Sequence, residues 1–226
     1  MKIGAVTGLA AEAKIARQLG MTVAVAGGGG RQGSERALSE LRRAGVTGIV
    51  SFGIAGALAP GLESGALVIP DAVVADDGSS VPVDMDWQGR LIDAAGARHF
   101  AVTLGGILGA DAIAATAAEK AALFIATAAI AVDLESLYVA LAARRARLPF
   151  VVVRTIADGA DRDLPPAALL PLKADGRPSL GAVLGSVARS PGQIPALMSV
   201  ARETAAAMRA LRRVAQALAP ELVPVR

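Results

Sequence analysis

The segment PFVVVRTIAD, residues 149–158, decides the fold class of this chain. Between Pro149 and Asp158 it is an almost continuous run of apolar and β-branched residues. A run without polar alternation predicts a strand that is buried on both faces of a sheet. We therefore expect an α/β fold with a largely buried sheet, in which this strand is central and leads into an acid, Asp158.

Outward from this strand, strand-like and helix-like segments alternate. Apolar runs predict further strands at 3–7, 22–26, 47–52, 66–75, 100–104 and 130–134, and periodicity predicts helices at 34–44, 116–126, 135–147 and 191–217. Pro70 bends its strand or places it at an edge, and Thr116 forms a capping box with Glu119. We expect one domain over residues 1–226, with a C-terminal helical segment at about 179–218.

The composition excludes several classes of protein. Hydrophobic residues make up 54% of the chain and aromatic residues 3%, so the core is expected to consist of small aliphatic side chains. No apolar run reaches the roughly 20 residues that span a bilayer, and the N-terminus lacks the basic segment of a signal peptide. We expect a cytoplasmic protein. The chain has no cysteine, so no disulfide is expected, and its single histidine, His99, argues against a histidine-based metal site. No aromatic residues stand among the arginine clusters, so nucleic-acid binding is not expected.

Several predicted strands end in glycine or in an acid, at residues 8, 27–30, 53–56, 135 and 158. In open α/β sheets, ligands bind beyond the carboxyl ends of the strands. The run GGGGRQGS, residues 27–34, lacks the GK[ST] of a Walker loop. A dinucleotide fingerprint also needs an acid after the next strand, and that strand ends in Ser51-Phe52. A glycine run by itself is a turn more often than a binding site.

Three segments together are more specific. They are MKIGAVTGLAAEAKIA (1–16), SFGIAGALAPGLESGALVIPD (51–71) and AVDLESLYVALAARRARLPFVVVRTIADGAD (131–161). In this order and spacing they resemble the superfamily of purine nucleoside phosphorylases and methylthioadenosine/S-adenosylhomocysteine nucleosidases. The motifs that carry the resemblance are the glycine motif at 53–58, its continuation at 62–68, the D-L-E at 133–135, and P-F-x-x-V-R-x-I-A-D at 149–158.

The resemblance covers residues 1 to 161 and implies a fold and an activity. The implied fold is a three-layer α/β sandwich around a mixed, twisted central sheet. The implied reaction is cleavage of a purine N-ribosidic bond in a homo-oligomer that needs no metal and no organic cofactor. The overall pattern, with AEK at 118–120 and AVDLES at 131–136, also resembles the hopanoid-associated phosphorylases, which implies adenosylhopane or another 5′-substituted adenosine as the substrate.

The resemblance assigns roles to the acids. Asp158 would protonate N7 of the purine, which requires a pKa raised by burial. Glu135 would accept hydrogen bonds from the ribose hydroxyls while Leu134 packs on the sugar, and Glu12 would orient water. Without the resemblance, Asp158 in Asp-Gly is equally typical of a turn, and Glu12 and Glu135 are typical acids of a first helical turn.

The remaining predicted contacts concern the base and the nucleophile. Ile113 falls near the position of a base-stacking Phe, and Ala157 is placed with it at the base. Phosphate or water would lie near residues of the glycine loops and their neighbours: Gly8, Arg31, Ser51, Gly53 and Ile54. Ile54 replaces a hydroxyl residue common in the family, whereas Glu12 favours water. Inorganic phosphate stays a candidate co-substrate, and the choice between phosphorolysis and hydrolysis stays open.

The segment LPPAALLPL, residues 164–172, is too apolar for a plain loop. One hypothesis is an apolar lip that admits a lipid-like 5′ substituent, which would place the protein peripherally at a membrane; the other is a contact between subunits. Two rival functions are a nucleoside-binding module without activity, which needs no acid, and a dinucleotide-dependent oxidoreductase, against which the missing ribose acid argues.

Overall fold

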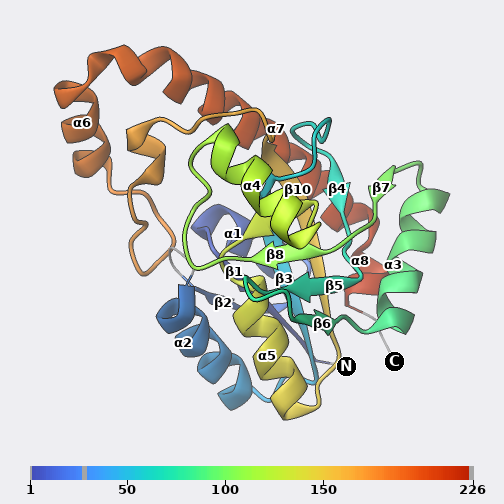
Figure 1. Ribbon diagram of the computed structural model, residues 1–226. Helices are drawn as coiled ribbons and strands as arrows, with labels where there is room; N and C mark the ends of the chain where they lie inside the picture. The colour runs from blue at the N-terminus through green and yellow to red at the C-terminus, as the bar shows by residue number, and fades with distance from the viewer. Residues whose placement is uncertain (1, 27–29, 224–226) are drawn as a thin grey trace.

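The computed structural model describes residues 2–26 and 30–223, which form one mixed sheet with helices on both faces (Figure 1). The first three residues of the predicted glycine loop at 27–30 lie outside the described residues. Two sets of side chains that are apolar and small fill the spaces between sheet and helices. The predicted three-layer α/β arrangement is therefore confirmed.

The strands are short except for two. They are β1 (Ile3–Thr7), β2 (Thr22–Val25), β3 (Gly48–Ala57), β4 (Leu67–Val68), β5 (Ala72–Val74), β6 (Ser80–Pro82), β7 (Val102–Thr103), β8 (Ile107–Gly109), β9 (Ala131–Asp133) and β10 (Phe150–Asp158). The two long strands, β3 and β10, pair in parallel at the centre of the sheet. The predicted central strand is therefore found where the sequence indicated.

Helices are interspersed with these strands along the chain. They are α1 (Ala10–Gln18), α2 (Gly30–Arg43), α3 (Met85–Ala97), α4 (Ala117–Thr127), α5 (Ser136–Ala146), α6 (Leu180–Arg189), α7 (Ile194–Ala217) and α8 (Ala219–Leu222), with 3₁₀ turns η1 (Pro166–Leu169) and η2 (Pro191–Gln193). The capping box at the start of α4 is confirmed: Thr116 accepts from the Glu119 amide at 3.1 Å, and Glu119 accepts from the Thr116 amide at 3.1 Å.

The sheet is mixed because β3 has different partners along its length. Its first residues pair in parallel with β1, whereas Gly56 and Ala57 pair antiparallel with β9. Along the sheet the order is β6-β5-β8-β9-β3-β10-β4-β7, with β1 and β2 beside the first half of β3. The predicted strand at 66–75 is divided at Pro70 into two strands, β4 and β5. Strand β4 pairs with β10 toward one edge of the sheet, and β5 pairs with β8 toward the opposite edge.

The helices divide between the two faces. Helices α2 and α5 pack on one face, through side chains such as Leu41 and Val139. Helices α1, α3 and α7 pack on the other, through Ile15, Trp87 and Leu211. Among the described residues, no helix is both long and apolar enough to cross a membrane.

Helix α7 has two parts with different surroundings. Its buried residues lie in the second part, and Thr155 of β10 donates a hydrogen bond to the Ala207 carbonyl there at 3.0 Å. The first part projects beyond the sheet beside α6 and η1 (Figure 1), and leaves Met198 51% exposed. This projecting part, α6 and η1 border the cavity described next.

Candidate active site

A cavity of about 460 Å³ lies where β3 and β10 end. One end of it is polar and contains four acids, and the other is apolar. The polar end is lined by Gly8, Leu9, Glu12, Ile54, Gly56, Lys120, Asp133, Glu135 and Asp158. The apolar end is lined by Leu164, Ala167, Leu170, Pro171, Leu172, Val183, Leu197, Val200 and Ala201. This polarity suits a ligand with one hydrophilic and one hydrophobic part.

Asp158 is the last residue of β10 and contacts a buried lysine. Lys120 of α4, only 1% exposed, donates to Asp158 Oδ2 at 2.5 Å. Burial raises the pKa of the Asp158 carboxyl, and the neighbouring Lys120 ammonium opposes that rise. A carboxyl group with a raised pKa is suited to hold a proton near neutrality and to donate it.

Beneath the polar end, Arg154 of β10 is completely buried between acids. Its Nη2 lies 2.7 Å from Asp133 Oδ2 and 3.2 Å from Glu135 Oε2. Glu12 also acts on this guanidinium electrostatically. A single positive charge thus faces three buried carboxyl groups. If all three carboxyl groups lost their protons, two negative charges would be left without a counter-ion in the interior.

The protonation of this cluster follows from its charge balance. Burial raises the pKa of Glu135 to about 8; Arg154 lowers it, and Asp133 and Glu12 add to the rise. Burial likewise raises the pKa of Glu12, against the attraction of Arg154 and three backbone amides. The pKa values of both glutamates are raised, so the cluster favours a protonated form in which one carboxyl group can donate as well as accept hydrogen bonds.

Glu12 belongs to the first turn of α1 and is 1% exposed. Its Oε1 accepts a hydrogen bond from the Ile54 amide and its Oε2 one from the Leu9 amide, both at 2.8 Å. The acid thereby ties the loop after β1 to the second half of β3. It also uses the amide at the N-cap of α1 and an amide within β3, which would otherwise be free for an anionic ligand.

Two glycines make this packing of acids possible. A Cβ at Gly53 would lie 2.4 Å from both Arg154 Nη1 and Glu12 Oε1, and a Cβ at Gly8 would lie 2.6 Å from Glu135 Oε1. Neither distance leaves room for a side chain. These positions are glycine because charged side chains press directly on the backbone.

The structure brings most of the predicted site residues together. The cavity is lined by Gly8, Glu12, Ile54, Ile113, Leu134, Glu135, Ala157 and Asp158, together with much of the predicted lip at 164–172. Ile113 is 41% exposed at its margin. The roles assigned to these residues stay predictions, but the shared location that the roles require is present.

Three residues predicted for phosphate do not reach the cavity. Ser51 is fully buried; its Oγ lies 2.9 Å from Ser136 Oγ and accepts from Arg154 Nη2 at 2.8 Å. Gly53 has the charged pair of Arg154 and Glu12 against its Cα. Arg31 is exposed on α2, with its guanidinium 5.9 Å from the centre of the Tyr138 ring. Of the five residues predicted for phosphate or water, the cavity lining therefore includes Gly8 and Ile54 but not Ser51, Gly53 or Arg31.

Sequence reasoning missed Arg154, Asp133 and Lys120. A signal existed for Arg154, since an arginine within an apolar central strand must be buried and must have acidic partners. Asp133 stands in the quoted D-L-E motif and received no role. Lys120 carried no signal, because its partner Asp158 lies 38 positions along the chain.

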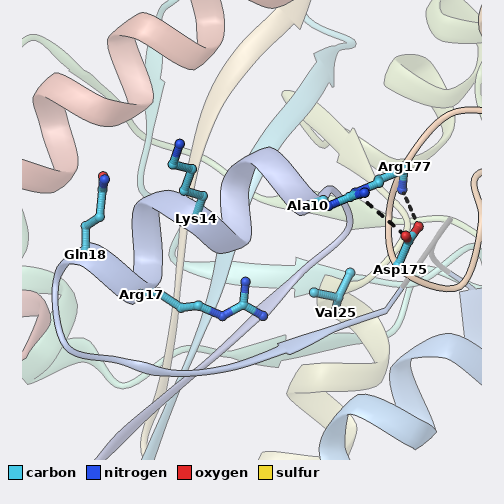
Figure 2. Close-up of a pocket in the computed structure, with 7 residues that line it drawn as sticks. All are labelled: Ala10, Lys14, Arg17, Gln18, Val25, Asp175 and Arg177. Atoms are coloured by element: carbon cyan, nitrogen blue, oxygen red, sulfur yellow. Dashed lines mark hydrogen bonds and ion pairs between the residues drawn. The ribbon is translucent and has the colours of Figure 1, made fainter.

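A second hollow lies apart from this cavity, on the outer face of α1 (Figure 2). Lys14, Arg17 and Gln18 line it from the helix, and Arg177 and Asp175, an ion pair at 3.7 Å, line it from the loop opposite. Figure 2 shows Lys14, Arg17 and Gln18 projecting from α1, where all three are exposed, whereas Glu12 of the same helix is buried. Helix α1 therefore separates exposed cations from the buried acid.

Comparison with known proteins places this architecture. Residues 31–174, well over half of the chain, match the family model described as the phosphorylase superfamily. No curated protein matches the sequence. Among solved structures, futalosine hydrolase of Helicobacter pylori is similar with a TM-score of 0.72 and 17% identity, over 96% of this chain and 97% of that chain.

Two further solved structures are similar over their full lengths. The 5′-methylthioadenosine/S-adenosylhomocysteine nucleosidase of Streptococcus pneumoniae has a TM-score of 0.71 and 19% identity, over 98% of both chains. The S-adenosylhomocysteine nucleosidase of Streptococcus pyogenes has 0.70 and 19%, over 100% of this chain and 98% of that chain. At these identities the similarity establishes a shared fold.

Proposed function

The chain belongs to the phosphorylase superfamily, and on this premise we propose that it cleaves the N-ribosidic bond of an adenosine-type nucleoside and releases adenine. The observation that carries the proposal is the convergence of Asp158, Glu135 and Glu12 on one cavity, each buried and each with a raised pKa. Acidic side chains with shifted pKa values that lie together in a cleft are typical of catalytic sites.

Breaking this bond needs a proton for the departing base. In the proposed reaction the electron pair of the C1′–N9 bond moves into the purine ring as N7 takes a proton from Asp158. A water oxygen oriented by Glu12 bonds to C1′, and the proton that this water loses returns to solvent by way of the Glu12 carboxylate. Ala157 and Ile113 border the space beside this acid and supply apolar contact for the base. Glu135 binds the ribose hydroxyls, with Leu134 against the sugar.

The geometry favours water over phosphate as the nucleophile. Glu12 occupies the amides of Leu9 and Ile54, and Ser51 is bonded to Ser136 and Arg154. A phosphate ion would meet a carboxylate where it needs donors. The solved structures above are named as nucleosidases and a hydrolase, which is consistent with hydrolysis. Phosphorolysis is the alternative.

The apolar end of the cavity supports a 5′-substituted substrate. Leu170, Leu172 and Leu197 line it, and Leu180 of α6 is 73% exposed nearby. We propose an apolar 5′ substituent, of which adenosylhopane is the largest candidate and methylthioadenosine the smallest. A lipid-linked substrate would bring the protein to a membrane surface. A homo-oligomer, with exposed Ile125 at a contact, remains part of the same proposal.

The test is adenine release from adenosine, methylthioadenosine, S-adenosylhomocysteine and adenosylhopane, each with and without phosphate. We expect release that does not need phosphate and that falls by about 10²–10⁴-fold in Asp158→Asn, the usual contribution of a general acid. Asp161→Asn is the matched control, because Asp161 is exposed and lies outside the cavity.

The adenine-release assay has three outcomes that would change the proposal. A requirement for phosphate would make the reaction a phosphorolysis and overturn the assignment of water. Equal losses in Asp158→Asn and Asp161→Asn would remove Asp158 from the chemistry. If none of the four nucleosides released adenine, the proposed activity would be wrong, and a nucleoside-binding module would take its place.

A further inference from the structure

Lys120 is a buried charge that the reaction above does not use. Its Nζ lies 2.5 Å from Asp158 Oδ2, 2.8 Å from the Gly159 carbonyl oxygen and 3.0 Å from that of Arg162. An ammonium group has three N–H donors and no acceptor, and here each donor has one oxygen. The amino group is therefore held as an ammonium ion in a fixed position.

The surrounding backbone keeps this ammonium in place. The chain after β10 is tied to the start of α4, since the Ala117 amide donates to Asp163 Oδ1 at 2.8 Å. Lys120 projects from the next turn of α4 into that loop. Because two of its three acceptors are backbone carbonyls, Lys120 stays bound whether or not Asp158 is ionised.

We infer that Lys120 is the positioning residue of the catalytic acid: it holds Asp158 by Oδ2 and leaves Oδ1 to carry the proton into the cavity. The inference rests on the proposed function. The ammonium donates to Oδ2 and cannot accept a hydrogen placed there, so the acidic hydrogen of Asp158 is favoured on Oδ1. Within the described residues Oδ1 has no hydrogen-bond partner, and it is the oxygen available to N7 of a purine.

Lys120 also acts on the charge that forms during the reaction. When N7 takes the proton from Oδ1, Asp158 becomes a carboxylate whose Oδ2 already contacts the ammonium. A preorganised positive charge at that point stabilises the acid's product form without rearrangement. The other charges that face Asp158 are Arg162 and Glu203, which pair with each other at 2.6 Å and act in opposite directions.

The test is Lys120→Met, with Lys14→Met as a matched control on the exposed face of α1. The reaction needs protonated Asp158, so activity is lost as the pH rises through the pKa of this acid. Removing the cation raises that pKa, and we expect the alkaline limb of the kcat profile to move up by about one to three pH units. At pH 7 we expect kcat to fall by about tenfold or more, through loss of positioning. Lys14→Met should leave both quantities unchanged.

A lower kcat with an unmoved alkaline limb would overturn the inference, since a merely structural lysine gives that result. A second measurement needs no turnover: the 13Cγ resonance of Asp158, assigned by Asp158→Asn, is titrated in the wild type and in Lys120→Met. A higher pKa in the variant supports the inference and an equal one contradicts it, even if adenine release fails altogether. Lys120→Gln, which keeps two donors without the charge, replaces Lys120→Met if that variant does not fold.

Discussion

The two ends of the cavity are built on different principles. At the polar end, acids at the ends of β-strands and at the start of α1 are held by Arg154, by Lys120 and by backbone amides, so each position is fixed by several bonds. At the apolar end, η1, α6 and the first part of α7 line the cavity with aliphatic side chains and leave large apolar groups such as Leu180 exposed. Gln193, which accepts from the Ala167 amide at 2.8 Å and donates to the Ser186 carbonyl at 3.0 Å, ties these elements together.

This difference teaches how the site divides its tasks. Charges must be placed accurately, and a sheet buried between helices gives that accuracy. Apolar contacts tolerate changes of shape and size, so a short 3₁₀ turn and two helix segments are sufficient. We expect substitutions at the polar end to affect the fold and the chemistry together, and those at the apolar end to affect the choice of substrate.

The largest effect on stability is expected from Arg154→Met. Loss of the guanidinium leaves Asp133, Glu135 and Glu12 buried without a counter-ion, which costs about 3–5 kcal/mol in the free energy of unfolding. Urea denaturation at pH 7 measures this loss. Arg98→Met removes the partially exposed pair with Glu221, at 3.8 Å, and should cost about 0–1 kcal/mol. Similar losses in the two variants would break the contrast between the buried cluster and the surface.

A smaller effect, visible as a pH dependence, is expected from Glu135→Gln. The unfolded chain releases this proton near the ordinary value of 4.5, whereas the folded protein keeps it up to about pH 8. The folded state binds more protons in that window, so the raised pKa makes stability fall as pH rises from 4.5 to 8. In Glu135→Gln this carboxyl group is gone, so the decrease of the free energy of unfolding with pH should become less steep by up to about 1.4 kcal/mol per pH unit. Parallel wild-type and variant curves of stability against pH would exclude a raised pKa.

The smallest effect is expected at the apolar end, from Leu170→Ser. Loss of apolar contact should raise KM for a substrate with a long apolar 5′ substituent by roughly fivefold to tenfold, about 1 kcal/mol. It should leave methylthioadenosine and the melting temperature nearly unchanged. Leu184→Ser is the control, because Leu184 is exposed on α6 and does not line the cavity. An equal loss with both nucleosides would mean that this end does not select the substituent.

Much of this arrangement followed from local patterns. The run 149–158 predicted β10, and the capping residues Thr116 and Glu119 predicted the start of α4. Strand β3 continues beyond the predicted end at 52 to Ala57, because pairing with β10 compensates for the poor strand propensity of Gly53 and Gly56. The three-residue β8 gave a pattern too weak to detect, whereas α6 lies within the helical segment predicted at about 179–218.

Long-range pairing set the limit for the candidate site. The acids were found because they stand at strand and helix ends, where motifs can be read. Ser51 also stands near a strand end, but its direction depends on Arg154 and Ser136, about a hundred residues further along the chain. Lys120 lies on a helix whose own pattern does not reveal that one lysine turns inward. Such contacts depend on how distant elements meet, which a local pattern does not record.

The two parts of helix α7 have different roles, packing in the core and lining the cavity. Its second part, with Ala207 and Leu211, is part of the core, whereas Leu197 and Val200 in the first part line the apolar end of the cavity. Variation can therefore accumulate in the first part without loss of folding. A directed library confined to the lining positions Leu197, Val200, Ala201 and Thr204 would explore new substrates on an intact catalytic scaffold, and the same division gives natural selection a route to new specificities within this fold.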